Sequence, residues 1–353
     1  MNILIVKLSA IGDVIHTLPA LNAVRKHHPD AHITWLVEED AATLIEGHEA
    51  LDRILVSKRK RWIKSLRSAS CLSTIKEIYR FIKVLRDTRY DMILDFQALL
   101  KSGILIALAR GRRKIGFGQG LEHMEHSYLF LNEHVPAVSM EHHALSRGLM
   151  FLNALGIPTP DVEYNLPVSD YDRKKVEDLL QRYGVVNPRR FVAINPVAKW
   201  ESKLWSNRKF AELADRIAAQ YDVEVVFTGS FEDRRTIHQI KADMGAPAVN
   251  LAGETTLKML AALYAKADVV ISTDTGPMHL AVAMGTPVVA LFGPTAPWRT
   301  GPFGSGHQVV TAGQACAPCF KRHCQTYDCM TLISIDQVFN AVSQIIEKKN
   351  GQA

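Results

Sequence analysis

Short apolar runs alternate with helix-like segments along nearly the whole chain, and this alternation leaves few folds open. The first apolar run covers residues 2–8 (NILIVKL), a helical segment follows from about residue 13 to 28, and a second run covers residues 32–39. Strands that alternate with helices indicate βαβ units and a parallel sheet. The runs are apolar almost throughout, which is expected when helices cover both faces of the sheet. The pattern therefore predicts an α/β chain built on doubly wound parallel sheets.

A change of composition divides this series in two. Residues 156–170 (GIPTPDVEYNLPVSD) are rich in proline and aspartate and are typical of a linker. A second series of strands and helices starts with the strand at 191–198, and an amphipathic helix begins after Ser334. Ligands bind outside the carboxyl ends of the strands in such sheets, so both domains are expected to face a central cleft. The predicted divisions are 1–165, 166–333 and a terminal helix in 334–353.

Composition is that of a globular protein, with 47% apolar and 22% charged residues among 353. No apolar run approaches the roughly 18 residues that span a bilayer. The N-terminal segment lacks a basic leader and carries Lys7 and Asp13, so we expect no signal peptide. A cytoplasmic location is therefore predicted.

Two clusters of basic residues lie in the N-terminal third, at residues 58–67 (KRKRWIKSLR) and 110–114 (RGRRK). The net charge of +6 is modest, so this excess is local. One such run is as readily a solvated face as a binding site, but two in one domain favour an anionic partner such as an acidic glycolipid or a membrane surface. The sequence lacks zinc-finger spacing, RNP-like aromatic motifs and basic helices that lead into heptads, so nucleic acid is not expected as a partner.

The first strand ends at SAIGD (residues 9–13), where a helix begins. Ser9 and Gly12 are predicted to contact a ligand there, because glycine permits a close approach of the backbone. Asp13 is either a residue that caps the helix or a functional carboxylate. Capping alone does not explain why a glycine-containing loop lies at the mouth of the predicted cleft.

The densest polar signal of the second domain is STDTGPMH, residues 272–279. The strand at 269–273 ends in Asp274, Thr275 and Gly276, and Pro277 begins a helix with His279 in its first turn. A helix N-terminus reached through Thr-Gly suits a phosphate or diphosphate. A purely structural turn with His279 in the core is the alternative, and an aspartic protease is a poor fit because the chain is not mainly β and has no second DTG copy.

Two other strand ends carry candidate contacts. Lys203 either brings an ammonium to an anion or is a surface lysine, and Glu232 either accepts hydrogen bonds from ribose hydroxyls or is a first-turn glutamate favoured by the helix dipole. The sequence has no G-x-G-x-x-G after a strand and no P-loop motif. A diphosphate site without either motif is typical of nucleotide-sugar enzymes.

Four of the five cysteines lie in CAPCFKRHCQTYDC, with His323 among them. Their spacing is compatible with a structural metal, although it is tighter than that of a usual four-cysteine zinc site. Reduced structural thiols and a disulfide are the alternatives, and a cytoplasmic setting disfavours the disulfide. The cysteines concerned are Cys316, Cys319, Cys324 and Cys329.

Three segments in order along the chain together resemble one known family. KLSAIGDVIHTLPAL (7–21), DFQALLKSG (95–103) and STDTGPMHLAVAMGTPVVALFGPT (272–295) are similar to the ADP-heptose:lipopolysaccharide heptosyltransferases of glycosyltransferase family 9. Within that family the first two segments are most similar to heptosyltransferase I, which adds the first heptose to Kdo-lipid A. Heptosyltransferase II is the nearest competitor.

The resemblance implies a GT-B fold of two Rossmann-like domains. The donor would bind the C-terminal domain and the acceptor the N-terminal one, with the terminal helix packed back across the N-terminal domain. Asp13 matches the catalytic base, Lys203 the diphosphate-binding lysine, and Glu232 the contact to the nucleotide ribose, with Asp233 left open as an alternative. The donor-binding signature matches Asp274, Thr275, Gly276 and His279.

The implied reaction is an inverting transfer of heptose from ADP-L-glycero-D-manno-heptose to Kdo of Kdo-lipid A. ADP leaves as a stable anion, so one base is enough, and Asp13 would accept the proton of the attacking hydroxyl. Lys203 and backbone N–H groups near Thr275 would stabilise the charge on the diphosphate, and this arrangement requires no metal or other cofactor.

The basic residues gain an expected use from the same resemblance. Kdo carboxylates and lipid A phosphates are anionic, so the first cluster would bind the acceptor and the inner leaflet of the cytoplasmic membrane peripherally. The alternatives are heptosyltransferase II or another family member that acts on a later core acceptor, a nucleotide-sugar epimerase, and a sugar-nucleotide-binding protein without turnover. The residues assigned to the membrane contact are Lys58, Arg59, Lys60, Arg61 and Arg67.

Overall fold

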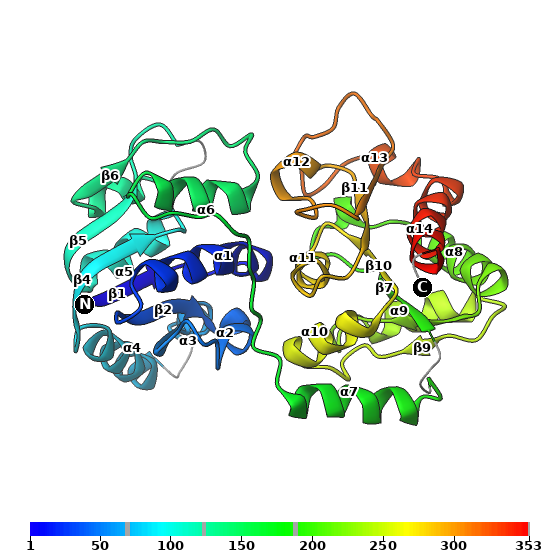
Figure 1. The fold of residues 1–353 in the computed structure, drawn as a ribbon, viewed down its shortest axis with the longest axis horizontal. Helices are drawn as coiled ribbons and strands as arrows, with labels where there is room; N and C mark the ends of the chain where they lie inside the picture. Colours follow the sequence, from blue (N-terminus) through cyan, green and yellow to red (C-terminus); the bar gives the residue numbers. More distant parts are fainter. Residues whose placement is uncertain (68–70, 122–124, 186–189, 352–353) are drawn as a thin grey trace. The chain divides into compact units, whose positions relative to one another are not determined.

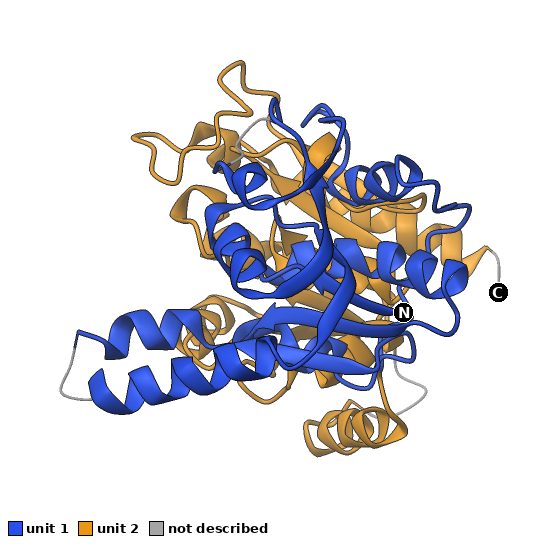
Figure 2. Ribbon diagram, turned by 90° about the vertical axis from the view of Figure 1, so that its left-hand side faces the viewer, with its two compact units in different colours: residues 1–167 blue, residues 168–353 orange. Residues whose placement is uncertain are grey.

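Two compact units make up the chain. A computed structural model describes residues 1–67, 71–121, 125–185 and 190–351. The units are Met1–Pro167 and Val168–Ala353, coloured separately in Figure 2. The boundary falls inside the proline- and aspartate-rich segment that the sequence marks as a linker, two residues beyond the expected end of the first domain at 165.

The first unit holds a six-stranded sheet in which every pair of neighbouring strands is parallel. Its strands are β1 (Asn2–Val6), β2 (His32–Glu38), β3 (Arg53–Ser57), β4 (Arg89–Asp95), β5 (Arg110–Phe117) and β6 (Glu133–Val135). Its helices are α1 (Ile11–His27), α2 (Glu39–Ile45), α3 (Arg59–Ser65), α4 (Cys71–Leu85), α5 (Leu100–Leu108), the 3₁₀ helix η1 (Ser127–Phe130) and α6 (Ala144–Asn153). The strand order is β3-β2-β1-β4-β5-β6.

Apolar side chains on both faces of this sheet explain why helices cover it on two sides. Leu4, Val6 and Ile93 form one core cluster with residues of α4 and α5, among them Leu85 and Ile106. In the other layer, helix α1 contacts both α2 and α6 (Figure 1). Residues 59–85 form α3 and α4, for which the sequence pattern gives no clear prediction, and the basic run at 110–114 is the exposed start of strand β5.

The second unit repeats this architecture with its own parallel sheet. Its strands are β7 (Arg190–Asn195), β8 (Val223–Phe227), β9 (Val249–Asn250), β10 (Val269–Thr273), β11 (Val288–Phe292) and β12 (Gln308–Thr311). Its helices are α7 (Asp170–Arg182), the 3₁₀ helix η2 (Glu201–Lys203), α8 (Asn207–Gln220), α9 (Arg234–Ala242), α10 (Leu257–Lys266), α11 (Gly276–Ala283), α12 (Pro297–Thr300), α13 (Asp328–Thr331) and α14 (Ile335–Asn350). The strand order is β12-β11-β10-β7-β8-β9.

Both sheets therefore follow one topology. In each, the first strand of the unit lies in the middle, the next two strands continue to one side, and the fourth to sixth strands continue to the other. Doubly wound sheets of this order bind ligands at the point where the strand order reverses, outside the carboxyl ends of the central strands. That point lies between β1 and β4 in the first unit and between β7 and β10 in the second.

The terminal helix α14 packs on the core of the second unit. Val342 and Ile346 of α14 are fully buried in a cluster that also contains Phe210 of α8 and Val289 of β11, all in the second unit. Helices α8, α9 and α14 cover one face of this sheet, and α10 and α11 cover the other (Figure 1). The apolar face of α14 is thus used by the core of the second unit, and the packing of this helix across the N-terminal domain, expected from the family resemblance, stays a prediction.

Every helix among the described residues is too short or too polar to cross a lipid bilayer. This result agrees with the absence of a long apolar run in the sequence.

Candidate active site

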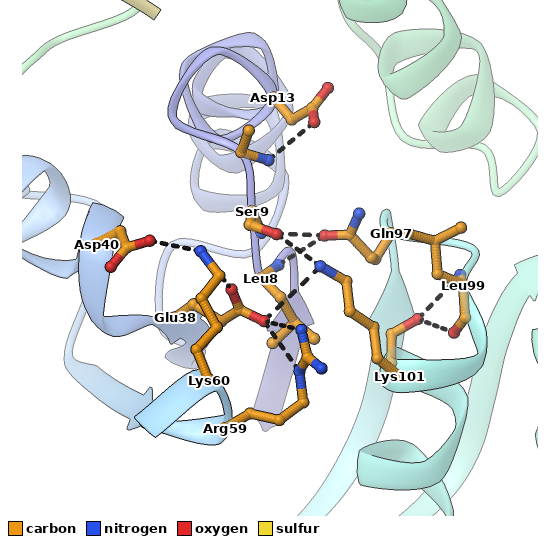
Figure 3. Close-up of polar contacts among 12 residues, drawn as sticks. Leu8, Ser9, Asp13, Glu38, Asp40, Arg59, Lys60, Gln97, Leu99 and Lys101 are labelled. Atoms are coloured by element: carbon orange, nitrogen blue, oxygen red, sulfur yellow. Dashed lines mark hydrogen bonds and ion pairs between the residues drawn. The ribbon is translucent and has the colours of Figure 1, made fainter. Parts of the chain in front are cut away.

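The loop after β1 is held in place by the loop after β4. The Gln97 side-chain oxygen Oε1 accepts hydrogen bonds from the backbone N–H groups of Leu8 (2.9 Å) and Ser9 (3.1 Å) (Figure 3). The Asp95 carboxylate in turn accepts from the N–H groups of Gln97 (3.0 Å) and Ala98 (3.2 Å). Burial raises the pKa of Asp95 to about 6. These contacts join the two strand ends at the switch point of the first sheet.

Asp13 lies in the first turn of α1, which begins at Ile11 and not at Asp13. Its carboxylate accepts the backbone N–H of Ala10 at 2.9 Å, and its second oxygen points away from that contact (Figure 3). The side chain is half-buried. Asp13 therefore has the structural role of capping the helix start, although from inside the first turn, and it still presents an oxygen away from the helix end.

A pocket of about 190 Å³ opens at this end of the first unit. Asp13 lines it together with the cationic side chains of Lys7 and Arg147 and with the aromatic rings of Phe96 and Phe117. Lys7 donates to the Phe96 carbonyl oxygen at 3.0 Å, and Arg147 donates to the carbonyl oxygens of Met140 and His142. A carboxylate beside two fixed cations and apolar rings suits an anionic ligand that has a hydroxyl group to deprotonate.

Lys101, within the segment DFQALLKSG, is a site residue whose role the sequence does not indicate. Its ammonium donates to the Ser9 hydroxyl at 2.6 Å and lies 3.7 Å from the Glu38 carboxylate (Figure 3). Burial lowers the pKa of Lys101, whereas the charge of Glu38 acts in the opposite direction. Only the fold brings Ser9, Glu38 and Lys101 together, because they belong to three separate βα units. Ser9 is thus held by Lys101, and Gly12 is buried in the first turn of α1.

The first basic cluster is largely paired within its own unit. Glu38 is only 2% exposed and lies 3.0 Å from Arg59 and 3.4 Å from Lys60. Lys58 and Arg61 both pair with Glu77 of α4. These contacts hold α3 against the end of β2 and against α4. Four of the five cations that the sequence assigns to a membrane contact are therefore paired with acidic residues of the same unit.

In the second unit, a buried ion pair lies at the equivalent switch point. The Lys203 ammonium donates to the Asp274 carboxylate at 2.6 Å and to the Asp274 carbonyl oxygen at 3.1 Å. Thr295, after β11, donates to the same carboxylate at 2.7 Å, and the His279 ring lies 4.0 Å from it. Lys203 also lies 4.6 Å from the ring centroid of Trp200. Lys203, Asp274 and His279 are predicted from the sequence, whereas Thr295 is present there only as the last residue of the segment similar to the family.

Thr275 and Gly276 mark the start of α11, as the sequence predicts. Thr275 is the N-cap residue, and its hydroxyl lies 3.3 Å from that of Ser272. The helix N-terminus leaves backbone N–H groups without partners in the helix, and the nearby Lys203 adds a positive charge. His279 is only 7% exposed, as expected for the alternative in which this histidine lies in the core. The arrangement is suited to an anionic group at the N-terminus of α11.

The two candidates for a ribose contact have different surroundings. The Asp233 carboxylate accepts from the backbone N–H of Ser230 at 2.8 Å and from its hydroxyl at 2.7 Å, so it closes the turn after β8. Glu232 is exposed, and hydrogen bonds from its own backbone N–H and from Ser230 hold its pKa below the usual range. This difference favours Glu232 as the carboxylate that a ligand reaches.

The cysteines of the second unit are free thiols. Cys316 and Cys324 are exposed and Cys329 is buried. Backbone hydrogen bonds from Tyr327 and Thr326 lower the pKa of Cys324, whereas burial raises that of Cys329. Among the described residues, which include all five cysteines, no group of three or more His, Cys, Asp or Glu side chains is placed to hold a metal ion.

Comparison with known proteins agrees with this geometry. The family model described as "Glycosyltransferase family 9 (heptosyltransferase)" matches residues 78–329. The chain is 30% identical over 334 residues to lipopolysaccharide heptosyltransferase 1 of Pseudomonas aeruginosa, covering 92% of this chain and 87% of that protein. It is 29% identical over 309 residues to the lipopolysaccharide core heptosyltransferase OpsX of Haemophilus influenzae, covering 87% and 83% respectively.

A solved structure gives the same result for the fold. The E. coli heptosyltransferase WaaC with ADP superposes with a TM-score of 0.74 at 26% identity, covering 99% of both chains. The expected GT-B class of two Rossmann-like units is thereby confirmed. The strand-end sites, the family match over 78–329 and the shared fold together show that the chain belongs to glycosyltransferase family 9, the heptosyltransferase family.

Proposed function

We propose that the protein transfers heptose from ADP-L-glycero-D-manno-heptose to Kdo of Kdo-lipid A, with inversion at C1 of the heptose. The observation that carries the proposal is Asp13 in the pocket of the first unit, beside the cations Lys7 and Arg147. A carboxylate at that place is expected for an enzyme that deprotonates a hydroxyl of an anionic acceptor. In a protein that only binds a sugar nucleotide, Asp13 would serve the helix start alone.

In this proposal the acceptor hydroxyl attacks C1 of the heptose and transfers its proton to Asp13, while the bond from C1 to the diphosphate oxygen breaks. ADP departs with the electron pair of that bond. Lys203 and the N–H groups at the start of α11 stabilise the charge that develops on the diphosphate. Glu232 accepts hydrogen bonds from the ribose of the nucleotide. The reaction needs one base because the leaving group is already a stable anion.

The similarity to a protein named heptosyltransferase 1 supports Kdo-lipid A as the acceptor. The relative named only as a core heptosyltransferase is nearly as similar, at 29% against 30% identity, and its name leaves the acceptor within the core unspecified. A heptosyltransferase II-like reaction on an already heptosylated core is therefore the second candidate.

The experiment measures ADP release from ADP-heptose with two acceptors, delipidated Kdo-lipid A and the same molecule already carrying one heptose. Release with the first acceptor alone is expected, and release with the second alone would establish the second candidate. Asp13→Asn is the matched variant, because an asparagine oxygen still accepts the Ala10 N–H and preserves the helix start. We expect this variant to lose at least about 100-fold in kcat with an unchanged melting temperature. Turnover at the wild-type rate would show that Asp13 is not the catalytic base.

A further inference from the structure

Helix α4 presents apolar side chains to solvent in a row. Leu72 is 78% exposed, Ile75 is 50% exposed and Tyr79 is 69% exposed. Their spacing of three and four residues places them on one side of the helix. The opposite side is occupied by Thr74 and Leu85, which are buried, so the exposed row is not needed for the packing of α4 on the sheet.

Basic residues flank this row on the same helix. Lys76, Arg80 and Lys83 are exposed, and within the described part of the chain none of them forms an ion pair. The acidic residue of α4, Glu77, turns toward α3, where it pairs with Lys58 and Arg61 and accepts the indole N–H of Trp62 at 2.9 Å. The outward side of α4 is therefore apolar and cationic without a compensating acidic group.

Helix α3 and its C-cap residue add exposed apolar side chains beside α4. Ile63 is 45% and Leu66 is 40% exposed, and Lys64 lies between them in the sequence. Trp62 packs on Phe81 with ring centroids 5.1 Å apart, which fixes α3 beside α4. Figure 1 shows the two helices together at one side of the sheet, and in Figure 2 they project from the rest of the first unit.

We propose that the outer face of α4, with α3 beside it, binds the surface of an anionic lipid bilayer. An amphipathic helix with exposed leucine, isoleucine and tyrosine and with flanking lysine and arginine fits the interface, where the apolar groups enter the acyl boundary and the cations meet lipid phosphates. A second copy of the chain fits less well, because a symmetric contact would bring the same unpaired cations together. The first basic cluster, at residues 58–67, positions α3 through its ion pairs. The membrane contact that the sequence predicts for this cluster is therefore proposed mainly for α4.

Vesicle co-sedimentation with the full chain tests this inference, because it uses neither substrate and so does not depend on the proposed reaction. The vesicles contain phosphatidylethanolamine with phosphatidylglycerol, or phosphatidylcholine alone. Binding to the anionic vesicles is expected, with a decrease at high salt. The variant K76Q/R80Q/K83Q is expected to bind on the order of 100-fold more weakly, since each cation near the surface contributes about fivefold. The variant Leu72→Ser/Tyr79→Ser is expected to bind the anionic vesicles roughly tenfold or more weakly than the wild type.

Matched control variants alter equally exposed residues elsewhere. Leu129 is 68% and Tyr171 is 71% exposed, so Leu129→Ser/Tyr171→Ser removes the same side chains outside α4. The variant K174Q/K175Q/R182Q removes three exposed cations of α7. These controls are expected to bind as the wild type does. The proposal is overturned if the wild type does not bind anionic vesicles, or if it binds phosphatidylcholine vesicles equally well. It is also overturned if the control variants lose as much vesicle binding as the α4 variants. A change of oligomeric state in light scattering, without a change in vesicle binding by the α4 variants, would contradict it as well.

Discussion

Asp274 is the residue on which the polar contacts of the second unit converge. Its carboxylate accepts from Lys203 and Thr295 and lies close to the His279 ring, and it is only 6% exposed. A buried carboxylate is costly without a cation, so Lys203 has both a structural partner and a predicted catalytic use. Any test of Lys203 therefore has to separate stability from rate.

Lys203→Met is expected to lower kcat by about 10² to 10³, the usual effect of removing one preorganised group that stabilises transition-state charge. It is also expected to lower the free energy of unfolding by roughly 3–5 kcal/mol, because Asp274 keeps its charge without its cation. The double variant Lys203→Met/Asp274→Asn removes that charge and should regain most of the stability, but not the rate. If rate and stability recover together in steady-state kinetics and chemical denaturation, Lys203 is only structural.

Asp95 makes the stability of the first unit depend on pH. Its pKa is about 6 in the folded chain and 3.8 ordinarily, so the folded state binds the proton more tightly. The stability from this group is fully present below about pH 4 and is lost as the pH rises through about 6. Asp95→Asn is the reference, because its amide keeps an acceptor for the Gln97 and Ala98 N–H groups. The free energy of unfolding of the wild type, relative to this variant, should fall by at most about 1.4 kcal/mol per pH unit in that window. Denaturation of both proteins between pH 4 and 7 measures this difference; parallel curves would contradict the raised pKa.

At the scale of elements, α14 shows how a helix start is encoded locally and its packing is not. The Ser334 hydroxyl accepts the Gln337 N–H at 3.1 Å, and the Gln337 side chain accepts the Ser334 N–H at 2.8 Å. This capping box explains why the helix begins where the sequence predicts. The apolar stripe that follows only requires some apolar partner, and the partner turned out to be the core of the second unit.

Ile346→Ala in α14 is therefore expected to lower the free energy of unfolding of the second unit by about 2–5 kcal/mol, because it leaves a cavity in a fully buried cluster. Lys348→Ala, on the exposed side of the same helix, should stay within about 0.5 kcal/mol of the wild type. Calorimetry of both variants is the measurement. An equal effect of the two substitutions would mean that the helix is not packed on this core.

For the whole molecule, two units with the same strand order place their polar residues at equivalent points. Asp13 and Gln97 lie at the ends of β1 and β4, and Lys203 and Asp274 follow β7 and β10. The positions of Asp13, Asp274 and Thr275 could be predicted because the apolar strands that precede them are easily recognised, and the strand ends of parallel sheets are where ligands bind.

Other parts of the site had no local signal. Lys101, Glu38 and Thr295 each lie beside a site residue that is distant in sequence, and a hydrogen bond between separate βα units leaves no periodic pattern. The pairing of the basic cluster with Glu38 and Glu77 is of the same kind. Apolar periodicity and capping residues act over a few neighbours, so the sequence alone suffices for the central strands of both sheets, several of the helices and the fold class. The short outer strands β6, β9 and β12 carry too few apolar residues to form such a pattern. The partners of buried charges and the face on which α14 packs depend on contacts between distant segments, so only the folded chain reveals them.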